Sequence, residues 1–350
     1  MEADFLPALS ATGVGSLPHQ DLARAINLIT NILPDTPFWP QLPKYSPLEN
    51  MIAQVSPGLP FLNVDEKKGE IFFADEREVA SELEKVYRAY LEKDNSAYSL
   101  PSRYIGGLEE MIRHLQTRSA PLKFFKGQMV GPITLGLAAK DKEGKDLIHN
   151  EVIFDALYKA LILRGCWLIQ KMKEVKARII FFLDEPALAG LGSAFFTVSP
   201  EVIRKTWEEV ISAWQSQGAL VGIHCCGNTD WSLLLESKVD IINFDAWSFW
   251  ERFVLYRDAL VDFLDRGGIL AWGIVPTAEF SGTETLEIIM TRLEGEMEEL
   301  ARQGLSRKKL YAQSLLTPSC GMGLLKEEQA EKMLSLLGKL SEQMQLKYLS

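Results

Sequence analysis

The stretch RIIFFLDEP, residues 178–186, sets the fold class of this 350-residue chain. An uninterrupted apolar run from Ile179 to Leu183 ends in two acids and a proline. Such a run is typical of a strand that is buried on both faces of a parallel sheet. Two adjacent acids after a buried run are costly without a partner, so Asp184 and Glu185 are candidates for function as well as for a helix N-terminus.

Similar apolar runs recur along the chain, and each closes in small or polar residues. The others are SATGVGSLP (10–18), LKFFKGQMVGP (122–132), ALVGIHCCG (219–227), VDIINFDAW (239–247), GILAWGIVP (268–276) and YAQSLLTPSCG (311–321). Apolar positions at helical spacing fill the intervals 151–176, 200–217 and 284–303, and the tail from about 326. Strands that alternate with helices predict an α/β fold.

We expect a (β/α)8 TIM barrel that forms a single domain over residues 1–350. Its eighth strand is expected near 38–42 or 59–64, within an N-terminal excursion at 34–76 that is rich in proline and then in charge. A doubly wound open sheet is the alternative. It has less support because neither GxGxxG after the first strand nor GxxxxGK[ST] occurs in the sequence.

Composition narrows the function classes. The formal net charge is -10, which does not suit a nucleic-acid partner. The start MEADFLPALSATGVG lacks a basic segment followed by a long apolar one, and no apolar run is long enough to span a membrane. We therefore expect a cytoplasmic protein with no membrane partner. The four cysteines do not make a disulfide scaffold and are expected to be core, metal-binding or catalytic.

Polar residues gather where the expected strands end. They are Ser16, Gln128, Asp184 with Glu185, His224 with Cys226, Asp245 and Cys320. In a barrel the carboxyl ends of the strands form the active-site face, so these side chains should converge there.

A metal site is the sharpest prediction from these residues. His224 and Cys226 are two positions apart and should point the same way, whereas Cys225 should face the core. Two thiolates, an imidazole and a carboxylate make a zinc shell, for which we nominate His224, Cys226, Asp245 and Cys320. The alternative is that each cysteine is simply a small buried hydrophobe.

Taken together, these stretches resemble the cobalamin-independent methionine synthase superfamily, which also includes uroporphyrinogen decarboxylase. The matching motifs are TGVGSLP (12–18), FWPQLP (38–43), FKGQMVGPITL (125–135), FLDEPAL (182–188), IHCCGNTDW (223–231), VDIINFD (239–245) and LTPSCGMG (316–323). They run in order over nearly the whole chain. The resemblance implies a catalytic zinc on the four nominated ligands and a methyl transfer to a thiol, most simply homocysteine giving methionine.

The resemblance also implies which residues bind substrate. Ser16 and Asp184 match the positions that hold the amino-acid end of homocysteine, and Glu49 in PLENM is our candidate for a further glutamate with that role. Asp245 stands where the family's methionine synthases have glutamate. The shorter side chain leaves open whether Asp245 binds zinc directly.

The methyl donor is expected to be a methylcorrinoid, carried by a corrinoid protein, rather than methyltetrahydrofolate. A folate nitrogen must be protonated to leave, which needs a positioned acid. The stretch WGIVPTAEF (272–280) lacks the histidine that the folate-dependent enzymes carry there. Three alternatives remain: a methylcobamide:coenzyme M-type methyltransferase, a non-catalytic homologue that binds zinc or a corrinoid protein, and a uroporphyrinogen decarboxylase-like enzyme.

Overall fold

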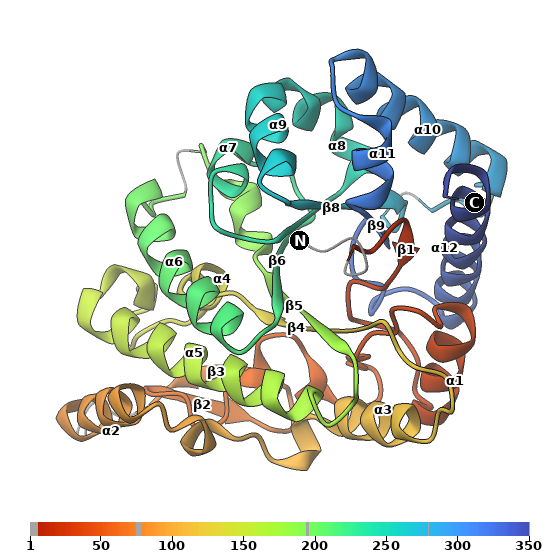
Figure 1. Ribbon diagram of the computed structural model, residues 1–350. Coiled ribbons are helices and arrows are strands. Elements are labelled where there is room, and N and C mark those ends of the chain that lie inside the picture. The colour runs from red at the N-terminus through yellow and green to blue at the C-terminus, as the bar shows by residue number, and fades with distance from the viewer. Residues whose placement is uncertain (1–5, 75–78, 194–195, 279, 350) are drawn as a thin grey trace.

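Seven parallel strands form the central sheet of the protein, in the order β1-β9-β8-β7-β6-β5-β4 (Figure 1). The computed structural model describes residues 6–74, 79–193, 196–278 and 280–349, so the last two residues of the expected excursion and both ends of the expected domain lie outside it. The strands are β1 (Ser10–Ala11), β4 (Phe124–Val130), β5 (Arg178–Asp184), β6 (Leu220–Cys225), β7 (Ile241–Phe244), β8 (Ile269–Val275) and β9 (Ser314–Pro318). Each lies within one of the seven predicted runs.

Helices surround this sheet, as Figure 1 shows. They are α1 (Leu22–Ile32), α2 (Val79–Glu92), α3 (Gly106–Gln116), α4 (Pro132–Ala138), α5 (Glu151–Met172), α6 (Pro200–Ser216), α7 (Trp231–Leu235), α8 (Ala246–Phe253), α9 (Arg257–Asp265), α10 (Leu286–Arg302), α11 (Arg307–Ala312) and α12 (Glu327–Tyr348). The four helices predicted from apolar spacing are confirmed as α5, α6, α10 and α12. Among the described residues, no helix is both long and apolar enough to cross a membrane.

The expectation of a closed (β/α)8 barrel is wrong, because the sheet is an open, curled one. In the described ranges, β1 pairs only with β9 and β4 only with β5. The segment PFWPQLP (37–43) lies between these two edges and makes one isolated bridge to each side, Phe38 to Lys126 and Gln41 to Ser16. Its prolines lack the amide hydrogen that a ladder needs, so the segment does not become an eighth strand.

Side chains tie the open edge where a strand ladder is missing. Lys126 on β4 is fully buried, and its ammonium group donates to the carbonyl of Val14 and, at 2.8 Å, to Gln128 Oε1. Gln128 Nε2 in turn donates to the carbonyl of Trp39 at 3.0 Å. Burial lowers the pKa of Lys126 to about 7, an effect that the nearby Asp184 carboxylate opposes. The loop after β1 is thereby held against β4.

The inner face of the sheet changes from apolar to polar along the strands. Alternate residues point inward, and one apolar cluster contains Phe124, Ile180, Phe182, Leu220, Ile241, Ile269, Ala271 and Leu315. The same alternation continues with Gln128, Asp184, His224 and Asn243 nearer the carboxyl ends. Polar groups therefore meet above a dry apolar base, at the end of the sheet where the sequence predicts a site.

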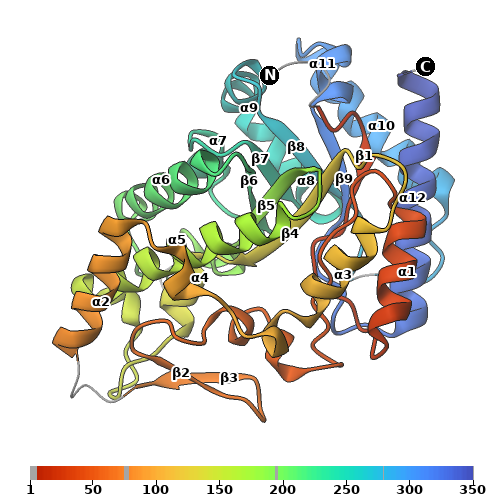
Figure 2. The same cartoon turned by 60° about the horizontal axis from the view of Figure 1, so that its bottom comes forward.

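The excursion contains a hairpin that lies apart from the main sheet. Strands β2 (Leu62–Asp65) and β3 (Glu70–Phe73) pair antiparallel as a separate two-stranded sheet, seen at the bottom of Figure 2. A buried arginine on α5 anchors the chain that leads into it: Arg164 donates to the carbonyl of Val55 at 2.6 Å and to that of Pro57 at 2.7 Å.

The adjacent acids of the DEP motif point in different directions and have different roles. Glu185 is fully buried and accepts hydrogen bonds from the backbone N–H of Ile133 (3.1 Å) and Thr134 (2.7 Å) at the start of α4. Trp207 Nε1 donates to the same carboxylate at 3.1 Å. A Cβ on Gly131 would lie 2.2 Å from the Glu185 carboxyl carbon, so glycine is required there. Glu185 therefore caps α4 from a distance.

Replacing Glu185 with alanine should lower the free energy of unfolding by about 3 kcal/mol, because three buried donors lose their acceptor at once. Chemical denaturation monitored by circular dichroism would measure the change. Asp184→Asn is the matched control at the neighbouring acid. It should leave the stability near that of the wild type or raise it, since it removes a buried charge. An equal loss in both variants would contradict the separate roles.

Candidate functional site

Three of the predicted metal ligands meet at the carboxyl ends of β6 and β9. The ligand atoms of His224, Cys226 and Cys320 all lie within 4.8 Å of one another. His224 is buried, and the two cysteines are partly exposed, so the cluster is open on one side. Cys225 lies between two of the ligands but belongs to the outer core, and its thiol faces the carbonyl of Gly227 at 3.5 Å.

The two ring nitrogens of His224 differ, because one is hydrogen-bonded and the other is not. Nδ1 lies 2.7 Å from Asn243 Oδ1, whereas Nε2 has no hydrogen-bond partner among the described residues. Zinc bonds to nitrogen and sulfur are about 2.0–2.3 Å long, so ligand atoms this close together can share one ion. The two thiols and the unpartnered Nε2 of the imidazole fit a zinc ion with one position left for a further ligand.

The two thiols lie close enough to shift each other's pKa. The neighbouring Cys320 thiol is the main reason why the pKa of Cys226 is lowered, and Cys226 in turn raises the pKa of Cys320. Burial by itself lowers the pKa of His224, but the neighbouring Cys226 and Asp184 outweigh it and raise that pKa. The cluster therefore favours one thiolate, as a ligand for a soft cation requires.

Asp184 lies beside the cluster with a carboxylate oxygen that is free to bind. It is opposite His224 in the register of β5 and β6. Burial raises its pKa to about 6, and the charges of Lys126 and His224 oppose that rise. Its Oδ1 is buried and has no hydrogen-bond partner in the part of the chain that the structure describes. A buried acceptor of this kind suits a cationic or hydrogen-bond-donating ligand.

Ser16 packs against the turn that carries Cys320. Its Oγ accepts a hydrogen bond from the backbone N–H of Gly323 at 3.2 Å, and its carbonyl accepts one from Met322 N at 2.9 Å. A Cβ on Gly321 would lie 2.3 Å from Ser16 Oγ. A Cβ at this position would force the Ser16 hydroxyl to move, so glycine suits the close approach of this turn to Ser16. The loop after β1 thus becomes part of the site wall.

Asp245 and Glu49 lie outside the three-residue cluster. Asp245 follows β7 on the same end of the sheet, but its Oδ1 caps α8 by accepting from Ser248 N at 2.9 Å. Glu49 is buried and accepts from Leu42 N at 2.8 Å and from Gly107 N at 3.1 Å. Both carboxylates thus have backbone partners, and the predicted roles in zinc and substrate binding stay predictions.

Sequence reasoning missed Asn243 as part of the site. Its amide contacts His224 from the middle of the buried run VDIINFD, where it lies two residues before Asp245. The available signal was a lone amide at an inward-facing position of an otherwise apolar strand. Such a group needs buried partners, and so it marks a polar network.

A second group of possible ligands has another explanation. His19, Glu327 and Glu331 also lie within 4.8 Å of one another. Arg24, however, donates to Glu327 at 3.2 Å and to Glu331 at 2.6 Å, so both negative charges are already paired. We assign this cluster a structural role in holding the chain before α1 against α12.

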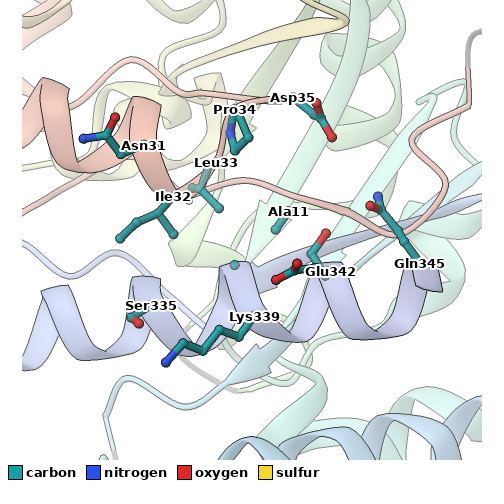
Figure 3. A pocket seen from close by; sticks show the side chains of 12 residues that line it. Ala11, Asn31, Ile32, Leu33, Pro34, Asp35, Ser335, Lys339, Glu342 and Gln345 are labelled. Atoms are coloured by element: carbon teal, nitrogen blue, oxygen red, sulfur yellow. The ribbon is translucent and has the colours of Figure 1, made fainter. Parts of the chain in front are cut away.

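A groove of about 420 Å³ lies between α1 and α12 (Figure 3). Asp35 and Glu342 line it. The carbonyl of Asp35 accepts a hydrogen bond from Phe124 N, so the groove lies near the start of β4. It contains none of the predicted site residues, so we do not connect it with the chemistry of the cluster.

Comparisons with known proteins bear on the fold of this chain. No protein-family model matches the sequence, and no curated protein matches it. The structure is similar to that of a B12-independent methionine synthase from Shewanella sp. W3-18-1 in complex with selenomethionine, with a TM-score of 0.57 at 13% identity over 97% of this chain and 99% of that chain. At 13% identity this likeness shows a distant relationship in fold alone, and the similar protein is an enzyme.

A weaker likeness involves a glycosidase. The tandem GH20 catalytic modules of the pneumococcal exo-β-D-N-acetylglucosaminidase StrH match with a TM-score of 0.48 at 10% identity, over 97% of this chain and 85% of that chain. We draw nothing from it.

Glu49 should give the stability a specific pH dependence. Burial raises its pKa to about 7 from the model-peptide value of 4.5, although the backbone donors Leu42 and Gly107 oppose this. A folded pKa above the unfolded one means that stability is full below about pH 4.5 and falls as the pH rises to about 7. Glu49→Gln should be less stable than the wild type at pH 4.5, because one hydrogen bond is lost. Its free energy of unfolding should then fall less as the pH rises, by up to about 3 kcal/mol, because glutamine does not ionise. Urea unfolding of both proteins between pH 4.5 and 8 would measure it, and parallel curves would contradict it.

Proposed function

We propose that the protein is a zinc-dependent methyltransferase whose acceptor is a thiol, with homocysteine as the preferred substrate. The observation that carries the proposal is the close approach of His224, Cys226 and Cys320 next to Asp184, whose buried Oδ1 has no hydrogen-bond partner among the described residues. The distant fold relationship to a B12-independent methionine synthase supports it. The resemblance of the motifs to that superfamily points the same way.

In this proposal His224, Cys226 and Cys320 hold the metal, and Asp245, which follows β7 at the same end of the sheet, is the candidate for a fourth ligand. A zinc ion held there supplies a place where a thiol ionises near neutral pH and becomes nucleophilic. The chain's own contribution is a preformed ligand cluster on rigid strand ends, which needs little rearrangement when it is occupied.

Asp184 and Ser16 would orient the acceptor. A buried carboxylate with a free oxygen favours an ammonium group, because a charge-assisted hydrogen bond satisfies both partners. That preference separates homocysteine from a thiol that carries a sulfonate, for which the cluster would need a nearby arginine or lysine. Lys126, the cation with the largest electrostatic effect on Asp184, already donates to Val14 and Gln128.

A methylcorrinoid is the proposed donor, bound by the protein directly or carried by a corrinoid protein. The support is chemical: the stretch 272–280 contains no histidine that could protonate a departing folate nitrogen. A corrinoid leaves without needing a proton. A homologue that binds the metal but has lost turnover is the alternative outcome of the assays below.

The purified protein should contain about one zinc ion per chain, as a site with three protein ligands would hold. Cys226→Ala should lose it, whereas the neighbouring Cys225→Ala should keep it, because these two thiols face opposite sides of the strand. Elemental analysis after reconstitution under reducing conditions would measure the metal. Zinc retained in the Cys226 variant, or lost equally from both variants, would contradict the site.

Replacing Asp184 with asparagine should impair homocysteine more than simple thiols. Loss of one charge-assisted hydrogen bond should raise the KM for homocysteine by about 10–100-fold. The KM for 2-mercaptoethanol, which has no ammonium group, should not change. Methyl transfer from methylcobalamin to each thiol would be followed by the absorbance change of the corrinoid. Equal losses for both thiols would contradict the role in acceptor recognition, and no transfer by the wild type would favour the non-catalytic alternative.

A further inference from the structure

A single buried amide connects His224 to the strand that leads to Cys320. Asn243 lies on β7, opposite His224 in the register of β6 and β7, and its Oδ1 is 2.7 Å from His224 Nδ1. Its Nδ2 donates to the carbonyl of Ala271 on β8 at 2.9 Å and to Thr317 Oγ1 on β9 at 2.8 Å. One side chain thus spans four adjacent strands of the sheet.

The two donor contacts decide which way the amide faces. A backbone carbonyl can only accept, so the end of the amide that meets Ala271 must be the nitrogen. The oxygen then faces His224, and an oxygen can only accept from the ring. His224 Nδ1 therefore carries the hydrogen, and the lone pair of the neutral ring is on Nε2, the nitrogen that has no partner within the described residues.

We propose that Asn243 is a positioning residue that fixes the tautomer and the ring orientation of His224, with Thr317 fixing Asn243 in turn. Asn243 and Thr317 are both fully buried, so water does not compete for these hydrogen bonds. Metal-binding histidines generally donate their second ring N–H to a fixed acceptor, and loss of that acceptor typically weakens metal binding by about 10–100-fold. The same amide also ties the His224 strand to β9, which ends just before Cys320.

This inference rests on the proposed metal site, but its first test needs no metal. Histidine ring nitrogens give different ¹⁵N shifts when protonated and when bare, and the chain has only four histidines to assign. At alkaline pH, the metal-free wild type should show His224 with hydrogen on Nδ1. Asn243→Leu removes the acceptor and should give a mixture of tautomers or the Nε2–H form. The Nδ1–H form kept in full by the variant would overturn the proposal.

The second test measures zinc affinity by competition with a chromophoric chelator. Asn243→Leu should weaken zinc binding by about 10–100-fold. Asn243→Asp keeps an acceptor facing His224 but turns an oxygen toward the carbonyl of Ala271. It should therefore bind zinc more tightly than Asn243→Leu and less tightly than the wild type, and it should regain part of the cobalt–thiolate absorption of the Co²⁺-loaded protein. Thr317→Val, which removes one partner of the amide, should give a smaller loss.

Gln313→Leu is the matched control for a purely structural effect. Gln313 is also a buried amide, and its Nε2 donates to the carbonyls of Leu264 and Gly268, but it lies before β9, away from His224. It should lower stability without changing zinc affinity. Equal weakening in the Gln313 and Asn243 variants, or wild-type affinity in Asn243→Leu, would overturn the role of Asn243 but leave the metal site standing. No zinc binding by the wild type would instead overturn the metal site on which the proposal depends.

Discussion

The register of the parallel strands is the constraint on which the candidate site depends. Asp184 lies opposite His224, and His224 opposite Asn243, so that one row across three neighbouring strands carries these polar groups. Because side chains alternate between the two faces, a shift of one residue in any strand would turn its polar group outward. The apolar cluster beneath the row opposes such a shift, since it would then expose aromatic and aliphatic side chains. Packing of the sheet interior therefore also keeps the polar side chains of this row facing inward.

Local patterns predicted the strands and the clustering of polar strand ends, but not the closure of the sheet. Apolar runs and helical spacing are properties of neighbouring residues, and they gave all seven strands and four long helices. Closure depends on whether residues 37–43 pair along both neighbours. Prolines there restrict the segment to single bridges, and the side chains of Lys126 and Gln128 supply the remaining hydrogen bonds across the gap. The resemblance of the motifs to a barrel superfamily therefore led to the wrong expectation that the sheet closes.

Carboxylates were the hardest groups to assign from the sequence, because the same residue type can bind a ligand or cap a helix. Glu185 holds the start of α4, Asp245 caps α8 and Glu49 accepts from two backbone amides, whereas Asp184 keeps an oxygen free. The sequence places all four near strand ends or turns. Which backbone N–H groups come within reach is decided by distant segments, so only the folded chain separates the four roles.

The two sides of the candidate site are held in place differently, because one side lies on central strands and the other lies at the open edge of the sheet. His224 and Cys226 extend from a central strand with neighbours on both sides, whereas Ser16 lies in a loop beside the two-residue strand β1. That loop is held from one side by the turn after Cys320, through Met322 and Gly323, and from the other by Gln41. The candidate ligands on β6 are thus fixed by the sheet, while the wall formed by Ser16 relies on contacts between loops. Such a division lets the loop that carries Ser16 adjust without disturbing His224 and Cys226.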